Sequence, residues 1–196
     1  MTKQEVISFY ETSSHEDTVA KILQQAREII DSQDSLNASA IVLDIDETSL
    51  NHYIPIRDAE FPQDQNHIIW DKLLSRTVGT PIKATLEFYK YCLDKGLKVF
   101  FISARLVEYL DATKQALISA GFDDFQDVYV FPEYVTQYDS EFFKSFKADR
   151  RAYIESLGYK VLISIGDQSS DLTGGHTRYT FQLPNYLYGQ NTAFKS

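Results

Sequence analysis

The sequence predicts an α/β fold with a mostly parallel sheet, because short apolar runs alternate with segments of helical periodicity along the chain. Runs without polar alternation are typical of strands that are buried on both faces. The segments between them are long enough for the right-handed crossover connections that parallel strands require. The expected strands are residues 41–43, 99–102, 128–131 and 161–165, with a further one at residues 179–183 on an edge of the sheet.

Length and composition fit one globular domain over residues 1–196. Hydrophobic residues make up 43% of the chain, which is enough to build a core. The net charge is -9 and no basic block is present, which argues against binding to a nucleic acid polymer. No apolar run approaches the roughly 20 residues that a membrane span needs. Because Cys92 is the single cysteine, an intrachain disulfide is excluded.

The expected helices follow from apolar spacing and from residues that favour helix ends. Residues 1–38 are expected to form a helical N-terminal extension, with Ser14 and Asp17 as a capping box. Thr80 and Pro81 predict the N-cap and first position of the next helix. The later helices are expected at residues 82–93, 107–120 and 150–157, ended by Gly96, Gly121 and Gly158.

Polar side chains gather where the predicted strands end. The first strand is followed by Asp44-Ile45-Asp46-Glu47-Thr48, the second by Ser103-Ala104-Arg105, and the fourth by Gly166-Asp167-Gln168-Ser169-Ser170-Asp171. Lys147 is expected to open the helix before the fourth strand. Because ligands bind beyond the carboxyl ends of parallel strands, these residues form the candidate site.

The acidic members of this group predict a metal site. Asp44 and Asp46 are two residues apart, so their side chains point to the same side of an extended chain. Two carboxylates about 4 Å apart repel by roughly 4 kcal/mol at an effective dielectric of 20, and Asp167 and Asp171 would add to that repulsion. Such a cluster needs a cation or shared protons. All candidate ligands are oxygen atoms, so the expected ion is a hard one, Mg²⁺ first.

The other members predict phosphoryl chemistry. Ser103, Arg105 and Lys147 can hold a dianionic phosphoryl group and neutralise charge in its transition state. One carboxylate then serves as nucleophile, and a second, two residues on, protonates the leaving alcohol and later activates water. Taken alone, Asp-x-Asp also occurs in calcium loops, and Gly-Asp-x-x-x-Asp at capped helix N-termini. The EF-hand glycine and terminal Glu are missing, and the order of the motifs favours a phosphoryl site.

These motifs resemble those of the haloacid dehalogenase (HAD) superfamily of phosphatases. The matches to its four motifs are Asp44-Ile45-Asp46-Glu47-Thr48, Ser103, Lys147 and Gly166-Asp167-Gln168-Ser169-Ser170-Asp171. From about residue 17 onward the chain is also similar to the subfamily III acid phosphatases (class B-like), a group with plant vegetative storage proteins and bacterial outer-membrane lipoprotein phosphatases. The stretches that carry this likeness are residues 146–151, 157–160, 166–172 and 183–188.

The resemblance implies a Rossmann-like three-layer HAD fold with a small or absent cap. It implies that Asp44 is the nucleophile and Asp46 the general acid/base. It implies that Mg²⁺ is held by the Asp44 carboxylate, the Asp46 backbone carbonyl and Asp167, with Asp171 acting through water. The phosphate-binding residues that it implies are Thr48, Ser103, Arg105 and Lys147, with Lys144 as the alternative to Lys147.

Residues 51–79 are expected to form an irregular insertion on the substrate side. Its aromatic residues Tyr53, Phe61 and Trp70 either stack on a nucleobase or pack the segment onto the domain. The histidines of the chain show no partner pattern, so a surface position and no role are expected for His52, His67 and His176.

Together, the motifs predict an acid phosphatase that hydrolyses small phosphate monoesters with Mg²⁺ through an aspartyl-phosphate, with nucleotides among the candidate substrates. Phosphoryl transfer between alcohols and a non-catalytic storage or binding role on the same fold are the alternatives. Retention of Asp44 argues against the non-catalytic role. No apolar segment follows residues 1–5, so a cytoplasmic protein is expected. A periplasmic or secreted mature form is the alternative, since relatives are usually exported.

Overall fold

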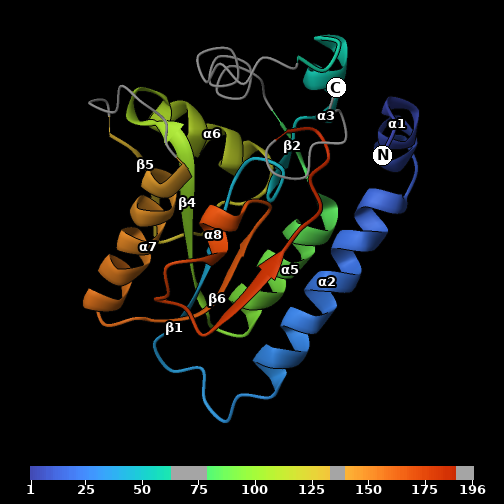
Figure 1. The fold of residues 1–196 in the computed structure, drawn as a ribbon. Coiled ribbons are helices and arrows are strands. Elements are labelled where there is room, and N and C mark those ends of the chain that lie inside the picture. Colours follow the sequence, from blue (N-terminus) through green and yellow to red (C-terminus); the bar gives the residue numbers. More distant parts are fainter. Residues whose placement is uncertain (63–78, 133–139, 189–196) are drawn as a thin grey trace.

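The computed structural model describes residues 1–62, 79–132 and 140–188. Within them, five parallel strands form one sheet in the order β5-β4-β1-β6-β7 (Figure 1). The strands are β1 (Ser39–Leu43), β4 (Lys98–Leu106), β5 (Asp127–Phe131), β6 (Lys160–Gly166) and β7 (Tyr179–Gln182). Every strand expected from the sequence is present, and β7 lies at an edge. The predicted parallel α/β fold is therefore confirmed.

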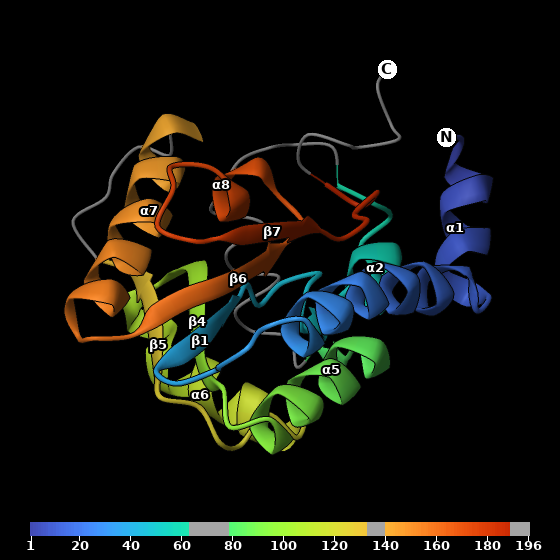
Figure 2. The same cartoon turned by 90° about the horizontal axis from the view of Figure 1, so that it is seen from below.

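Helices cover both faces of the sheet, which gives three layers (Figure 2). One face carries α2 (Ser14–Asp31), α5 (Lys83–Asp94) and α6 (Leu110–Ser119), the last preceded by the short 3-10 helix η1 (Val107–Tyr109). The other face carries α7 (Ser140–Ser156) and α8 (Ser169–Leu172). Alternate residues of β1 face the two layers: Ile41 and Leu43 join the core with α2 and α5, whereas Val42 joins the core under α7.

The N-terminal residues form two helices, and the second belongs to the central layers. α1 (Lys3–Glu11) begins with a capping box between Thr2 and Glu5. In α2, Val19, Leu23, Ala26 and Ile30 are buried in the same core as β1, so α2 is a structural layer and not an appendage. The capping box predicted at Ser14 is wrong, because Ser14 is already helical and the Ser13 hydroxyl bonds the Asp17 carboxylate instead.

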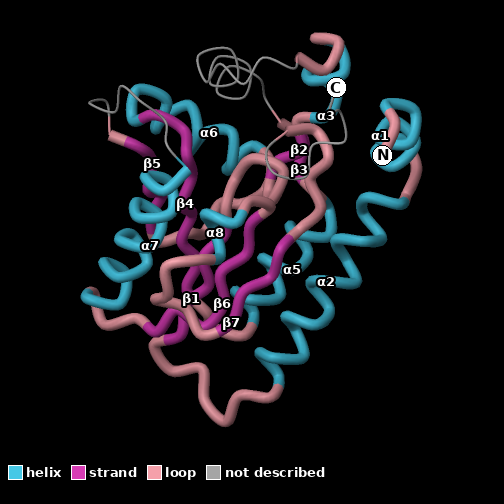
Figure 3. The backbone as a smooth tube through the Cα atoms, in the orientation of Figure 1, coloured by secondary structure: helices cyan, strands magenta, loops and turns pink. Residues whose placement is uncertain are grey.

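The segment after β1 is more regular than predicted. β2 (Leu50–Asn51) pairs antiparallel with β3 (Thr80–Pro81), and α3 (Tyr53–Asp58) follows β2. Figure 3 shows all three beyond the carboxyl ends of the parallel strands. The expectation of an irregular segment is therefore wrong at its two ends, while residues 63–78 lie outside the described residues. Thr80 is not an N-cap, because it pairs in β3 and α5 begins only at Lys83.

Helix ends agree with the predicted glycines but not with every predicted start. Gly96, Gly121 and Gly158 follow α5, α6 and α7 with positive φ angles. α7 begins ten residues before the expected position 150, so Lys147 lies inside that helix and not at its first turn. Among the described residues, no helix is both long and apolar enough to cross a bilayer.

Candidate active site

The polar residues predicted for the site converge at the carboxyl ends of β1, β4 and β6. The Asp44 N–H donates to the Ile165 carbonyl at 2.9 Å, which continues the pairing of β1 with β6. Pairing of β4 with β5 becomes irregular after Ile102, so Ser103 leaves the regular ladder. The site residues are almost fully buried, namely Asp44, Asp46, Thr48, Ser103, Arg105, Lys147, Asp167 and Asp171.

Asp44, Asp167 and Asp171 form a triad of buried carboxylates. Each offers one oxygen atom, and these atoms lie within 4.8 Å of one another. Burial and the neighbouring Asp171 charge raise the pKa of Asp44 well above its usual value, although Lys147 opposes the shift. The same two causes raise the pKa of Asp167 to about 7. The triad is therefore short of positive charge, and its all-oxygen donor set fits a hard divalent cation.

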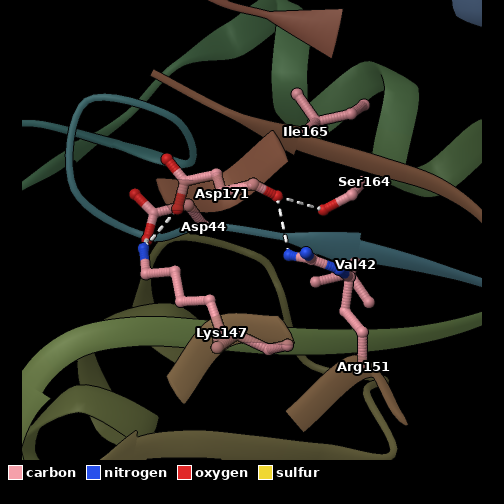
Figure 4. A pocket seen from close by; sticks show the side chains of 8 residues that line it. Val42, Asp44, Lys147, Arg151, Ser164, Ile165 and Asp171 are labelled. Atoms are coloured by element: carbon pink, nitrogen blue, oxygen red, sulfur yellow. Dashed lines mark hydrogen bonds and ion pairs between the residues drawn. The ribbon is translucent and has the colours of Figure 1, made fainter. Parts of the chain in front are cut away.

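Lys147 contacts two carboxylates of the triad and offsets part of their negative charge. Its Nζ donates to Asp44 Oδ1 at 2.7 Å and also to Asp171 Oδ1 (Figure 4). Burial lowers the pKa of Lys147, but the charges of Asp171 and Asp44 outweigh it and raise that pKa overall. Of the two lysines considered from the sequence, Lys147 and not Lys144 is therefore the one that reaches Asp44. Lys147 therefore lies in the candidate site although the predicted helix start is wrong, and its contact with phosphate stays a prediction.

Two hydrogen-bond donors hold the backbone carbonyl of Asp171. Arg151 Nη1 and the Ser164 hydroxyl both donate to this carbonyl oxygen, each at 2.9 Å (Figure 4). Arg151 lies four residues after Lys147, so one face of α7 contacts both ends of Asp171. A Cβ on Gly166 would lie 2.2 Å from the Asp171 Cβ, so only glycine fits at the start of this motif.

Asp167 is held by residues that carry no charge. Asn185 Nδ2 donates to Asp167 Oδ2 at 2.7 Å, and the Gln168 amide donates to the same oxygen. The Thr48 hydroxyl contacts Asp167 Oδ1 at 3.4 Å. Thr48 was expected to bind phosphate; its hydroxyl contacts Asp167 here, and the phosphate contact stays a prediction. Asn185 was not among the predicted site residues, although it lies in the stretch 183–188 that carried the family likeness.

Asp46 lies in a different environment, because Arg105 binds its carboxylate. Arg105 Nη2 donates to Asp46 Oδ1 at 2.7 Å, and Nε donates to Oδ2 at 3.0 Å. Burial would raise the pKa of Asp46, but Arg105 and His52 outweigh it and lower that pKa. The Arg105 Nη1 atom donates to Thr113. Arg105 was expected to contact phosphate; here it forms an ion pair with Asp46, and the phosphate contact stays a prediction. The Ser103 hydroxyl accepts the Arg105 backbone N–H at 3.1 Å.

Two residues that the sequence did not assign, His52 and Glu47, complete this part of the site. His52 is fully buried, and its Nδ1 lies 3.5 Å from Asp46 Oδ1 and 3.4 Å from Glu47 Oε1. The expected surface position of His52 is therefore wrong. His176 does lie at the surface, where it pairs with Glu155, and His67 is outside the described residues.

Two of the three aromatic residues proposed for substrate stacking, Tyr53 and Phe61, are buried in a cluster of their own. Tyr53 and Phe61 are each 3% exposed, in a cluster with Val6 of α1, Ile56 of α3 and Leu187. Tyr53 also stacks on Tyr10 with ring centroids 5.0 Å apart. The packing interpretation therefore holds for these two rings, and stacking on a nucleobase by them is wrong. Trp70 lies outside the described residues.

A family model described as "HAD superfamily, subfamily IIIB (Acid phosphatase)" matches residues 2–191. Acid phosphatase 1 of Solanum lycopersicum is 26% identical over 149 residues, which are 75% of this chain and 57% of that protein. A stem 31 kDa glycoprotein of Glycine max is 28% identical over 128 residues, which are 64% of this chain and 49% of that protein. The chain thus spans about half the length of the curated relatives that it matches.

Solved structures share the fold. The class C acid phosphatase from Bacillus anthracis superposes with a TM-score of 0.73 at 20% identity, covering 98% of this chain and 91% of that one. A structure of a class C acid phosphatase from the same organism with tungstate bound gives a TM-score of 0.69 at 20% identity, with the same coverage. At this identity the likeness establishes the three-layer fold and nothing about the chemistry.

Proposed function

Since the chain belongs to subfamily IIIB of the HAD superfamily, the acid phosphatases, we propose that it hydrolyses small phosphate monoesters with Mg²⁺ through an aspartyl-phosphate on Asp44. The observation that carries this proposal is the contact between Lys147 and Asp44 inside the buried carboxylate triad. A buried nucleophile beside one lysine and two further acids suits transfer of a phosphoryl dianion, whose charge needs both a cation and a lysine.

The residues of the triad fit the metal. Mg²⁺ would be held by the Asp44 carboxylate, the Asp46 backbone carbonyl and Asp167, with Asp171 behind them. These donors are all oxygen atoms, and the raised pKa values of Asp44 and Asp167 mean that an added cation relieves repulsion among them. When bound, the ion would neutralise charge on the phosphoryl oxygens.

The chain's own residues supply the covalent chemistry. An Asp44 carboxylate oxygen forms a bond to phosphorus while the ester P–O bond breaks. The electron pair of that bond goes to the leaving oxygen, which takes a proton from Asp46. Asp46 must take up that proton before this step, against the Arg105 ion pair that lowers its pKa. Water then attacks the same phosphorus, gives a proton back to Asp46, and displaces Asp44. Lys147 and Ser103 are assigned to the phosphoryl oxygens throughout, as the sequence motifs suggested.

The substrate class stays broad. Because Tyr53 and Phe61 are buried in the cluster with α1, they do not support recognition of a nucleobase. The hypothesis of nucleotide hydrolysis therefore rests on Trp70 alone. Equal loss of nucleotide and aryl phosphate turnover in Trp70→Ala would remove that support.

The test compares Asp44→Asn with Asp46→Asn on a panel of phosphomonoesters with Mg²⁺. Asp44→Asn keeps the shape but removes the nucleophile, so we expect a loss of roughly 10⁴-fold or more in kcat. Asp46→Asn is expected to lose about 10²- to 10⁴-fold while Mg²⁺ still raises the thermal midpoint, because its proposed metal contact is the backbone carbonyl. Turnover by Asp44→Asn at the wild-type rate would disprove the nucleophile, and activity that resists EDTA would disprove the metal.

A further inference from the structure

Within the proposed function, Asp46 must present its carboxylate to the leaving oxygen in a fixed direction. Arg105 contacts both carboxylate oxygens, so the orientation of the guanidinium fixes the orientation of Asp46. An arginine side chain has several rotatable bonds and is itself in need of support. The residues that surround Arg105 and Asp46 therefore decide how well the proton carrier is aligned.

His52 contacts both members of this ion pair. Its Nε2 lies 3.4 Å from Arg105 Nη2, and its Nδ1 lies 3.5 Å from Asp46 Oδ1. Nε2 faces a guanidinium N–H and can only accept a hydrogen bond there, which assigns the proton to Nδ1. The protonated Nδ1 then lies 3.5 Å from Asp46 Oδ1 and 3.4 Å from Glu47 Oε1, near both carboxylates but without a well-aligned hydrogen bond to either. A fully buried ring that touches both partners prevents either from rotating away.

Glu47 in turn holds His52. Its Oε1 accepts the backbone N–H of His52 at 2.8 Å, and its side chain is fully buried. Glu47 has a φ of 58°, a left-handed conformation that a residue with a side chain adopts only at an energetic cost. The Glu47 N–H donates to the Leu50 carbonyl at 2.8 Å, which closes the turn between the nucleophile and β2. Strain and burial at Glu47, directly after Asp46, point to a role beyond folding.

The β2–β3 pair leaves room for the imidazole. Gly79, directly before β3, is so close to His52 that an added Cβ would lie 2.7 Å from its Nε2. No positive φ is recorded at Gly79, so the absence of a side chain there serves space and not backbone conformation. The β2–β3 pair thus packs closely against one side of the ring.

We propose that His52 and Glu47 are positioning residues that align Asp46, through Arg105, for proton transfer to the leaving oxygen. Neither residue is assigned a contact with the phosphoryl group. The proposal rests on the proposed function, and its signature is dependence on the leaving group. An ester with an acidic alcohol needs little protonation when its P–O bond breaks, whereas an alkyl ester needs it fully.

The experiment measures kcat/KM for p-nitrophenyl phosphate, phenyl phosphate and glycerol 2-phosphate. This ratio reports the steps up to the first P–O cleavage, so the later action of Asp46 on water does not obscure it. For His52→Gln we expect a loss of only a few-fold on p-nitrophenyl phosphate and about 100-fold on glycerol 2-phosphate. Asp46→Asn sets the largest leaving-group dependence that the site can show.

Two further variants guard against a simple loss of folding. Gly79→Ala keeps His52 but pushes its ring, and Glu47→Gly relieves the left-handed strain while removing the carboxylate. Both are expected to change the ratio between the esters in the same direction as His52→Gln. The matched control is His15→Gln, since His15 is also buried but packs against Phe9 and Tyr10. It is expected to lower all three rates equally or not at all.

Equal losses on the three esters in His52→Gln and Gly79→Ala, or no loss in either, would overturn the positioning role. That result differs from failure of the proposed function, which Asp44→Asn reports independently. If Asp44→Asn is inactive and the ester ratio of the His52 variant stays at the wild-type value, only the positioning role is lost.

Discussion

Asp44 and Asp46 are two residues apart and nearly equally buried, at 6% and 8% exposure, yet their pKa values move in opposite directions. Asp44 shares one lysine with Asp171 and lies beside Asp167, so negative charge is in excess around it. Asp46 has a guanidinium of its own and a histidine beside it. Burial is common to both acids, and the balance between neighbouring acids and neighbouring cations decides the sign of the shift.

The difference divides the site into two sides. The nucleophile side comprises Asp44, Lys147, Asp167 and Asp171, and it needs a cation from outside the chain. The acid/base side comprises Asp46, Arg105, Glu47 and His52. There the charge of Asp46 is balanced by Arg105 of the same chain. Substitutions on the nucleophile side should therefore change metal affinity and the rates for all esters. Substitutions on the acid/base side should discriminate between leaving groups.

The largest effect that tests this division is expected for Lys147→Met. The change removes the lysine that contacts the nucleophile, so we expect kcat/KM to fall about 10³-fold. The loss should be the same for p-nitrophenyl phosphate and glycerol 2-phosphate. Lys144→Met, one turn earlier on α7, makes the same change in charge and is expected to stay within about twofold of wild type. A loss that grows with the basicity of the leaving group would place Lys147 on the acid/base side.

A smaller effect is expected for Asn185→Ala. Asn185 donates to the Asp167 oxygen Oδ2, and such supporting contacts typically contribute about 10- to 100-fold in metal affinity. The Mg²⁺ concentration for half-maximal activity should rise by that factor, while kcat at saturating Mg²⁺ stays close to wild type. Titration of activity with Mg²⁺ separates the two quantities. An unchanged Mg²⁺ requirement would show that Asp167 does not depend on this contact.

The two sides were not equally predictable from the sequence. Asp44, Asp167 and Asp171 each follow a buried strand, and the rule for parallel sheets brings strand ends together whatever the details of packing. Lys147 was predicted from its place before the fourth strand and its match to the third HAD motif, even though the predicted start of α7 was wrong. The first turns of that helix carry no simple apolar stripe, because Lys147 is buried for its contacts with acids.

The acid/base side depends on contacts that no local pattern encodes. Arg105 lies near the carboxyl end of β4, but its ion pair with Asp46 depends on side-chain packing between β1 and β4. His52 is buried beside the β2–β3 pair, and that pair needs β3, whose residues resembled a helix start. Tyr53 and Phe61 were placed on the substrate side because the packing of α1 on α3 could not be foreseen. Gly79 is the sequence feature that goes with the burial of His52, but its reason, the close approach of the ring, is visible only in the structure.

The smallest effect concerns stability and pH on the nucleophile side. Asp167 has a folded-state pKa of about 7 against an unfolded value of 3.8, so between these values the folded chain without metal holds a proton that the unfolded chain has lost. The free energy of unfolding must therefore decrease as pH rises through this window. The lowered pKa of Asp46 acts below the window and does not compensate.

Between pH 5 and pH 8 we expect the thermal midpoint of the EDTA-treated protein to fall by roughly 5 °C relative to Asp167→Asn, whose amide does not titrate. Mg²⁺ binds the ionised carboxylates, so it should raise the wild-type midpoint more at pH 8 than at pH 5. Equal stabilisation by Mg²⁺ at both pH values would mean that the triad is already ionised without metal, and the contrast with Asp46 would then have to come from Arg105 alone.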